Sequence, residues 1–242
     1  MTILDAHTVF GFWPQRRADL SPETLLRTLE EHGIASALTL STHGIFADFA
    51  SGNDETIAIC ERARKRLTPV GTVDPRRFVG TIEEIRKRRE QGVKAWRLFP
   101  ELQDWSLESR AVEGILKTLK DNGALLLIDA SRPGDPTRVA ARTAQFELPT
   151  ILLGVGGRLM GELLALLGEA KHLVVETRRL ADPEIIVALA RRFGPDRLVF
   201  GSASPLQYFS SARLALENAP LKDAERAQIL GGNLQRLLGE GH

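Results

Sequence analysis

Ala124–Asp129 (ALLLID) is an unbroken apolar run that ends in one carboxylate, and runs of this kind decide the fold. Similar stretches recur along the chain, among them LTLST (residues 38–42), TILLG (residues 150–154) and HLVVET (residues 172–177). Near-continuous apolar strands, without alternating polar residues, are typical of parallel strands that are covered on both faces. The sequence therefore predicts a parallel sheet enclosed by other elements.

Working outward from this run, eight strands are expected, each followed by a stretch with helical periodicity and none joined to the next by a hairpin turn. The predicted strands are Thr2–His7, Ala35–Ser41, Thr68–Val73, Val93–Phe99, Ala124–Ile128, Thr150–Leu153, His172–Glu176 and Arg197–Phe200. Several helices have clear start signals, such as Ser21 before Pro22 and Asp182 before Pro183. This alternation predicts an α/β fold, a (β/α)8 TIM barrel, with a doubly wound open sheet as the alternative.

The chain is expected to form one domain over residues 1–242. A single barrel of this type takes about 250 residues, and no Gly-, Ser- or Pro-rich linker divides the 242 residues here. The segment near Asp223–Leu238 is predicted to be an extra C-terminal helix that packs against the barrel wall.

The composition limits the classes of molecule that the protein is expected to bind. Apolar residues make up 43% and charged residues 26%, which is typical of a globular protein. The net charge of +1 gives no broad attraction to nucleic acid or to an anionic membrane. No apolar run approaches the ~20 residues that span a bilayer. We therefore expect a small-molecule ligand as partner, with no nucleic acid and no membrane; a homo-oligomer is compatible with the sequence.

The cysteine content bears on the cellular compartment. Cys60 is the one cysteine, so no internal disulfide can form. The N-terminal residues MTILDAHTVF lack a basic segment followed by a long apolar run, so no signal peptide is evident. Both features fit a reducing cytoplasm, and a cytoplasmic location is expected.

Barrel active sites form at the carboxyl ends of the strands, so polar residues there are the functional candidates. We assign catalytic roles to His7 and Asp129, because imidazole and carboxylate groups exchange protons near neutral pH. The substrate-binding candidates are Arg97, His43, Glu176 and Ser202. No residue is assigned to a metal.

Each main candidate also has a structural interpretation. His7 could instead be held by a hydrogen bond to Asp5 or to a neighbouring strand. Asp129 could form a salt bridge with Arg97 or Arg132, because buried carboxylates are usually paired. Arg97 could clamp a substrate carboxylate or phosphate, or could serve in that ion pair. In either case we expect His7, Arg97 and Asp129 to converge around one cavity.

Motifs spread over the whole chain add a family resemblance. Asp5–Gly11 (DAHTVFG), Val70–Arg76 (VGTVDPR), Gly92–Pro100 (GVKAWRLFP), Phe193–Pro205 (FGPDRLVFGSASP) and Ile229–Leu238 (ILGGNLQRLL) follow one another in the order of known motifs. Together they resemble the amidohydrolase-related family (amidohydrolase 2), metal-dependent hydrolases with a TIM-barrel fold.

The resemblance implies a divalent metal held by two His on strand one, a His on strand five and an Asp after strand eight. His7 matches the first of these positions, whereas Val9, Asp129 and Ala203 stand at the others, and Val155 replaces a His on strand six. Valine and alanine have no lone pair for a metal. The resemblance therefore predicts a degenerate metal site and no cofactor, with a divalent metal such as zinc as the alternative.

Two functions follow from this comparison. The first is a divergent amidohydrolase-like enzyme, a hydrolase or lyase acting on a small polar or anionic substrate without the family metal. The alternative is a non-catalytic relative, a pseudoenzyme that binds a ligand or a partner. The replaced metal positions favour the alternative, and the charges retained at the strand ends favour the enzyme.

Overall fold

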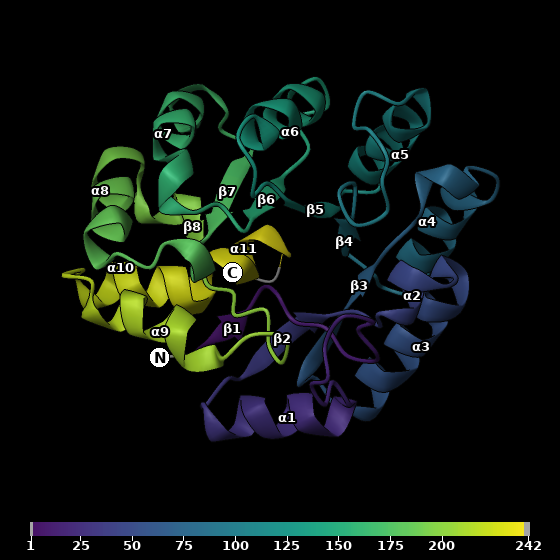
Figure 1. Cartoon of the computed structure of the whole chain (residues 1–242), viewed down its shortest axis with the longest axis horizontal. Helices are drawn as coiled ribbons and strands as arrows, with labels where there is room; N and C mark the ends of the chain where they lie inside the picture. The colour runs from purple at the N-terminus through teal and green to yellow at the C-terminus, as the bar shows by residue number, and fades with distance from the viewer. Residues whose placement is uncertain (1, 240–242) are drawn as a thin grey trace.

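Eight parallel strands lie side by side in chain order, β1 to β8, within the residues that the structure describes, 2–239. The structure is a computed structural model (Figure 1). Sequential order is typical of a barrel, whereas a doubly wound sheet reverses its strand order near the middle. The predicted TIM-barrel class is confirmed, and the open-sheet alternative is wrong. Met1 and residues 240–242, which the predicted domain includes, lie outside the described residues.

The strands are short and the helices surround them, as Figure 1 shows. The strands are β1 (Leu4–Asp5), β2 (Ser36–Thr39), β3 (Leu67–Gly71), β4 (Ala95–Leu98), β5 (Leu125–Asp129), β6 (Thr150–Leu153), β7 (Leu173–Glu176) and β8 (Leu198–Val199). The α-helices are α1 (Pro22–Glu31), α2 (His43–Phe46), α3 (Phe49–Arg62), α4 (Thr81–Glu90), α5 (Arg110–Asp121), α6 (Asp135–Ala144), α7 (Met160–Glu169), α8 (Pro183–Phe193), α9 (Phe209–Asn218), α10 (Asp223–Ala227) and α11 (Asn233–Leu237). Short 3-10 turns are η1 (Pro75–Arg77), η2 (Gly157–Leu159), η3 (Thr177–Arg179) and η4 (Pro195–Arg197), and η5 (Gln228–Gly232) is a π turn.

Local sequence signals explain where the helices begin and end. The Ser21 side chain accepts a hydrogen bond from the Thr24 N–H and so caps α1, and Pro22 takes the first helical position. Leu25 and Leu29 then bury the face of α1 that packs on the sheet. Gly33, with φ +65°, ends the helix in the left-handed conformation that glycine adopts without strain.

The first and last strands meet beyond their assigned ends. The Ala6 N–H donates to the Phe200 carbonyl at 3.0 Å, and the Ala203 N–H donates to the His7 carbonyl at 2.8 Å. A parallel bridge between Thr8 and Ser204 extends this contact. These bonds join the segment after β1 to the segment after β8 and place His7 at the seam.

Strand periodicity sorts the apolar side chains into two layers. Along β5, Leu125 and Leu127 belong to a cluster inside the barrel, whereas Leu126 and Ile128 pack in the cluster between the strands and the helices. The same alternation holds along β4, where Ala95 lies inside and Trp96 lies outside. Successive strand residues point to opposite faces of the sheet, so the same alternation determines which polar side chains point into the barrel.

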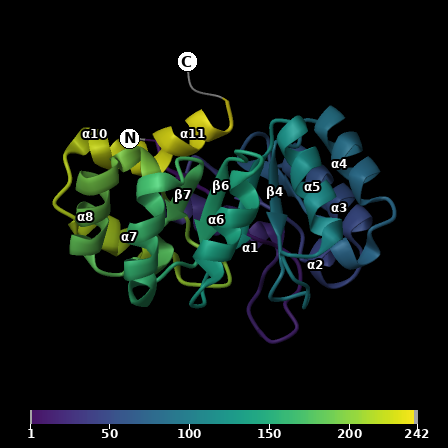
Figure 2. The same ribbon diagram turned by 90° about the horizontal axis from the view of Figure 1, so that it is seen from above.

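The C-terminal segment, predicted as one helix that packs against the barrel wall, is divided into α10, η5 and α11. Its first half does contact the wall, since the Phe200 N–H donates to the Ile229 carbonyl. The π turn η5 then lets α11 pass beneath the barrel, where Leu234 and Leu238 join the interior cluster. Figure 2 shows α11 on the face opposite the projecting loop after β1. The helix therefore closes the amino-terminal end of the barrel and leaves the carboxyl end for the site.

None of the helices within residues 2–239 combines the length and apolar character needed to cross a membrane.

Because Leu234 seals the barrel base, we expect Leu234→Ala to lower the free energy of unfolding by about 2–4 kcal/mol through lost burial and a residual cavity. The matched control is Leu214→Ala on α9, where the side chain is 54% exposed and the change should stay within about 0.5 kcal/mol. Urea unfolding of both variants measures the difference. Equal effects at the two positions would show that α11 does not seal the barrel.

Candidate functional site

Three charged side chains enter the barrel mouth because of their strand register. Arg97 follows Ala95 by two residues on β4, Asp129 follows Leu127 on β5, and Glu176 follows Val174 on β7. With a side-chain period of two, each shares the interior face with the apolar residue before it. All three lie near the carboxyl ends of their strands, as the sequence predicts.

These side chains form one chain of contacts with His7. His7 Nδ1 lies 3.0 Å from Glu176 Oε1, and His7 Nε2 lies 2.7 Å from Arg97 Nη1. Arg97 Nη2 donates in turn to Asp129 Oδ2 at 2.8 Å. The structure therefore brings together His7, Arg97, Asp129 and Glu176, and of the two partners considered for Asp129 it is Arg97 that binds the carboxylate.

The contacts determine the tautomer of His7. A guanidinium group can only donate hydrogen bonds, so His7 Nε2 must accept from Arg97 and carry no proton. Nδ1 then carries the proton and donates it to the Glu176 carboxylate. Burial, together with the nearby Arg97 charge, lowers the pKa of His7 below its ordinary value. His7 is therefore held as a neutral imidazole.

Glu176 holds the His7 ring in place. Its carboxylate is fully buried and accepts from His7 Nδ1, from the Gly154 N–H at 3.0 Å and from Arg178 Nε at 3.2 Å. Burial alone would raise the pKa of Glu176, but these partners outweigh it and lower the pKa to about 2. Glu176 therefore stays ionised and orients His7, and its oxygens are taken up by these protein donors.

Ser202, predicted to bind substrate, is turned into the protein. Its hydroxyl donates to Asp5 Oδ2 and its N–H donates to Asp5 Oδ1 at 3.0 Å. Asp5 Oδ1 also accepts from the His7 backbone N–H at 2.9 Å, whereas the His7 ring binds Glu176 and Arg97 and makes no bond to Asp5. Burial raises the pKa of Asp5 to about 7, although the three hydrogen bonds oppose this shift. Ser202 thus ties β8 to β1 through Asp5.

A cavity of about 170 Å³ opens above these groups. His7, Arg97 and Asp129 line it, together with Trp13, Arg16 and Arg178. A neighbouring cavity of about 340 Å³ shares Trp13, Arg97 and Asp129 with it. We call the two together the arginine cavity.

Arg16 has no periodic signal in the sequence, because it lies in the irregular segment between β1 and α1. Arg178 lies two residues after the end of β7, close to the predicted strand end.

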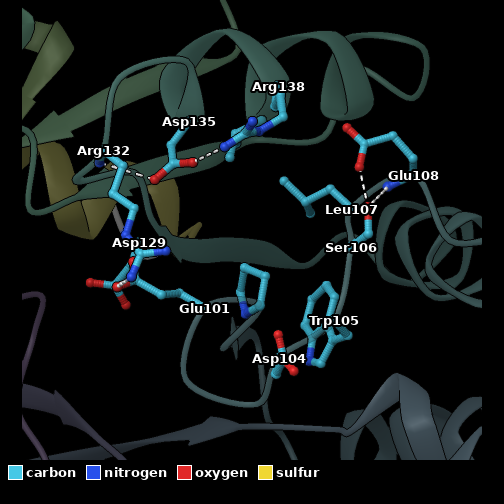
Figure 3. Close-up of a pocket in the computed structure, with 12 residues that line it drawn as sticks. Glu101, Asp104, Trp105, Ser106, Leu107, Glu108, Asp129, Arg132, Asp135 and Arg138 are labelled. Atoms are coloured by element: carbon cyan, nitrogen blue, oxygen red, sulfur yellow. Dashed lines mark hydrogen bonds and ion pairs between the residues drawn. The ribbon is translucent and has the colours of Figure 1, made fainter.

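A third cavity, of about 330 Å³, lies beside the arginine cavity and has the opposite character. Figure 3 shows Asp135 between Arg132 and Arg138, with Glu101, Asp104 and Glu108 around the same space. Arg132 pairs with Glu101, and Arg138 pairs with Asp135. Because carboxylates outnumber the two arginines in this third cavity, an anion is better accommodated in the arginine cavity.

His43 belongs to neither of these spaces. It begins helix α2, is half exposed, and lies 3.6 Å from Glu55. It lines a separate groove with Phe12 and Phe46. The structure therefore does not bring His43 together with His7, because α2 carries it outward from the mouth.

The residues at the mouth do not fit a divalent metal of the kind the family resemblance implies. Both ring nitrogens of His7 are hydrogen-bonded, and the Arg97 guanidinium lies between His7 and Asp129. Val9, Val155 and Ala203 are buried apolar residues. Throughout residues 2–239, no group of three or more His, Cys, Asp or Glu side chains is arranged to hold a metal ion.

Comparisons with known proteins agree with this fold. The family model described as amidohydrolase matches residues 13–239. No curated protein matches the sequence.

Solved structures extend the likeness over nearly the whole chain. A protein named as a probable 2-pyrone-4,6-dicarboxylic acid hydrolase from Acinetobacter baumannii, with citric acid bound, is 16% identical with a TM-score of 0.74, covering 99% of this chain and 100% of that one. The 5-carboxyvanillate decarboxylase of Sphingomonas paucimobilis is 14% identical with a TM-score of 0.78, covering 98% and 99%. A dihydroxybenzoic acid decarboxylase from Polaromonas, with bound manganese and 2-nitroresorcinol, is 14% identical with a TM-score of 0.76, covering 98% and 97%. At these identities the likeness establishes a shared fold.

The raised pKa of Asp5 predicts a specific pH dependence of stability. An acid whose pKa rises from 3.8 unfolded to about 7 folded stabilises the fold at low pH, and this contribution is lost as the pH rises through about 7. Asp5→Asn keeps a side-chain oxygen for the backbone donors but cannot ionise. We therefore expect the free energy of unfolding of the wild type, minus that of Asp5→Asn, to fall between pH 5 and pH 8.

Urea unfolding at the two pH values measures this difference, and titration of other groups such as His7 largely cancels in it. Asp121→Asn, at an exposed carboxylate at the end of α5, is the control and should show no such trend. If Asp5→Asn runs parallel to the wild type, Asp5 does not carry the pH dependence.

Proposed function

Because the chain belongs to the amidohydrolase family, we propose that it is a hydrolase or lyase that acts on a small carboxylate-bearing molecule in the arginine cavity. One observation carries the proposal. The smaller part of this cavity is lined by Arg16, Arg97 and Arg178 against the single carboxylate of Asp129. A small cavity with excess positive charge and partly enclosed walls favours an anionic ligand.

The geometry supports different roles for the three arginines. Arg97 and Arg178 are nearly buried and each already bonds a carboxylate, so their positions are set before a ligand arrives. Arg16 is exposed, and its side chain forms no ion pair among residues 2–239. Arginine binds carboxylates with two parallel N–H groups, so Arg16 is suited to bind the ligand from the loop side.

The names of the similar structures support the same substrate class. The decarboxylases are named for aromatic carboxylic acids, and the hydrolase is named for a dicarboxylic acid and has citric acid bound. In this chain, Trp13 and Phe99 supply aromatic walls beside Arg97, and the guanidinium of Arg97 lies 4.6 Å from the centre of the Phe99 ring. A flat acid could therefore stack on an aromatic wall while its carboxylate meets the arginines.

Asp129 is the stronger candidate for proton transfer. Oδ2 binds Arg97, while Oδ1 has no hydrogen-bond partner among the described side chains and the residue faces both parts of the cavity. His7 has both ring nitrogens engaged, so in this geometry it acts by positioning Arg97. Arg97 in turn can stabilise negative charge that develops on a substrate oxygen.

The charge of the ligand provides the first test. We expect small carboxylic acids, such as hydroxybenzoates and citrate, to raise the melting temperature, and the corresponding amides or esters to have no effect. Arg16→Ala should weaken binding about tenfold, which corresponds to about 1.4 kcal/mol. The matched control is Arg17→Ala, the next residue in the same loop, which does not line the cavity. Equal loss in both variants, or no preference for acids, would contradict the proposal.

Turnover provides the second readout of the same experiment. For an acid that binds, loss of its ultraviolet absorption or release of carbon dioxide reports hydrolysis or decarboxylation. Asp129→Asn should reduce turnover by at least about 100-fold, the usual contribution of an acid–base group, while binding persists. Binding without turnover in the wild type would instead favour the non-catalytic relative.

A further inference from the structure

We infer that the Arg97 guanidinium takes the place of a catalytic metal cation at the barrel mouth. The inference concerns the cation alone and holds for any substrate of the cavity. The family resemblance implies a metal near His7, whereas the side chains found there bind the Arg97 guanidinium.

The guanidinium is bound as a metal would be bound, by an imidazole nitrogen and a carboxylate oxygen. His7 Nε2 accepts from Nη1 at 2.7 Å, and Asp129 Oδ2 accepts from Nη2 at 2.8 Å. The same two donor types, imidazole and carboxylate, hold zinc in catalytic sites. In this protein the imidazole and the carboxylate bind a guanidinium instead. The register of β4 directs the Arg97 side chain into the barrel mouth between them.

The surrounding residues fix both the charge and the position of this cation. Glu176 holds the His7 ring with its free lone pair toward Arg97, and the Phe99 ring lies against the guanidinium. The Arg97 side chain is only 7% exposed. Arginine side chains carry a permanent positive charge in proteins.

The guanidinium also keeps donors in reserve. It has five N–H groups, and two of them are used by His7 and Asp129. Arg97 Nε is buried and has no hydrogen-bond partner among residues 2–239. A catalytic metal likewise keeps an open position for a substrate oxygen. The second N–H of Nη1 and of Nη2 would offer a substrate oxygen the same electrophilic contact, because Arg97 lines the cavity, whereas the buried Nε would not.

A direct consequence is that removing the guanidinium should create a place for another cation. In Arg97→Ala, His7 Nε2 and Asp129 Oδ2 lose their shared partner, and the space between them opens. A divalent metal and free methylguanidinium should then compete for that space. In the wild type neither should enter.

The test uses the full chain, freed of metal with a chelator, and Co²⁺ as the probe. For Arg97→Ala we expect visible absorption that saturates near one Co²⁺ per chain, with at least tenfold tighter binding than in the wild type. Methylguanidinium at millimolar concentration should raise the melting temperature of this variant and displace Co²⁺ competitively. Arg97→Ala/Asp129→Asn should lose most of the gain in binding of both cations.

Two further variants serve as a control and as a replacement in the Co²⁺ experiment. Arg132→Ala removes an arginine of the neighbouring part of the cavity that pairs with Glu101, and it should gain no Co²⁺ affinity. Arg97→Gln replaces Arg97→Ala if the alanine variant does not fold, because it removes the charge but keeps a polar side chain beside Phe99.

A measurement on the wild type alone completes the test. Adding Mn²⁺ should leave the His7 ring resonances in the nuclear magnetic resonance spectrum unbroadened. Selective broadening of those resonances would overturn the inference, since a metal would then reach His7 with Arg97 present. The inference would also fall if wild type and Arg97 variants bound Co²⁺ equally, if no variant bound it, or if methylguanidinium and Co²⁺ bound without competition.

Discussion

The Arg97 guanidinium joins opposite sides of the barrel mouth, and the rest of the site depends on it. It binds His7, just after β1, and Asp129, at the end of β5. A cation placed at the mouth of an apolar barrel is costly unless carboxylates and lone pairs surround it. Asp129 stabilises the guanidinium by a direct ion pair. Glu176 on β7 stabilises it indirectly, because it orients the His7 ring whose lone pair faces Arg97. Four strands or strand extensions thus meet at one charge, which sets the electrostatics of the cavity.

Most of the fold could be predicted from the sequence because its signals are local and periodic. The apolar runs predict the positions of all eight strands. The two-residue period of the strands places the side chains of Arg97, Asp129 and Glu176 on the interior face. The path of α11 could not be predicted, since its apolar residues fit either the wall or the base, and the π turn that decides between them has no simple sequence signal.

The site was predictable only where strands carry it. His43 and Ser202 were chosen as strand-end residues, but a short helix carries His43 outward and Asp5 holds the Ser202 hydroxyl inside. Arg16 was missed because an irregular loop brings it to the cavity from a segment without periodicity. Similar structures share the barrel at 14–16% identity, so the chemistry of this chain has to be argued from its own side chains.

The protonation state of His7 tests the central claim most directly. Nitrogen-15 chemical shifts of the His7 ring report which nitrogen carries the proton, and they can be followed from pH 5 to pH 8. The account predicts a neutral ring at pH 7, protonated at Nδ1 and bare at Nε2, because Arg97 donates to Nε2 and because burial and the Arg97 charge hold the pKa of His7 below its ordinary value. A ring protonated at Nε2, or an imidazolium that forms near pH 6.5, would contradict the account, since neither can accept a hydrogen bond from the guanidinium.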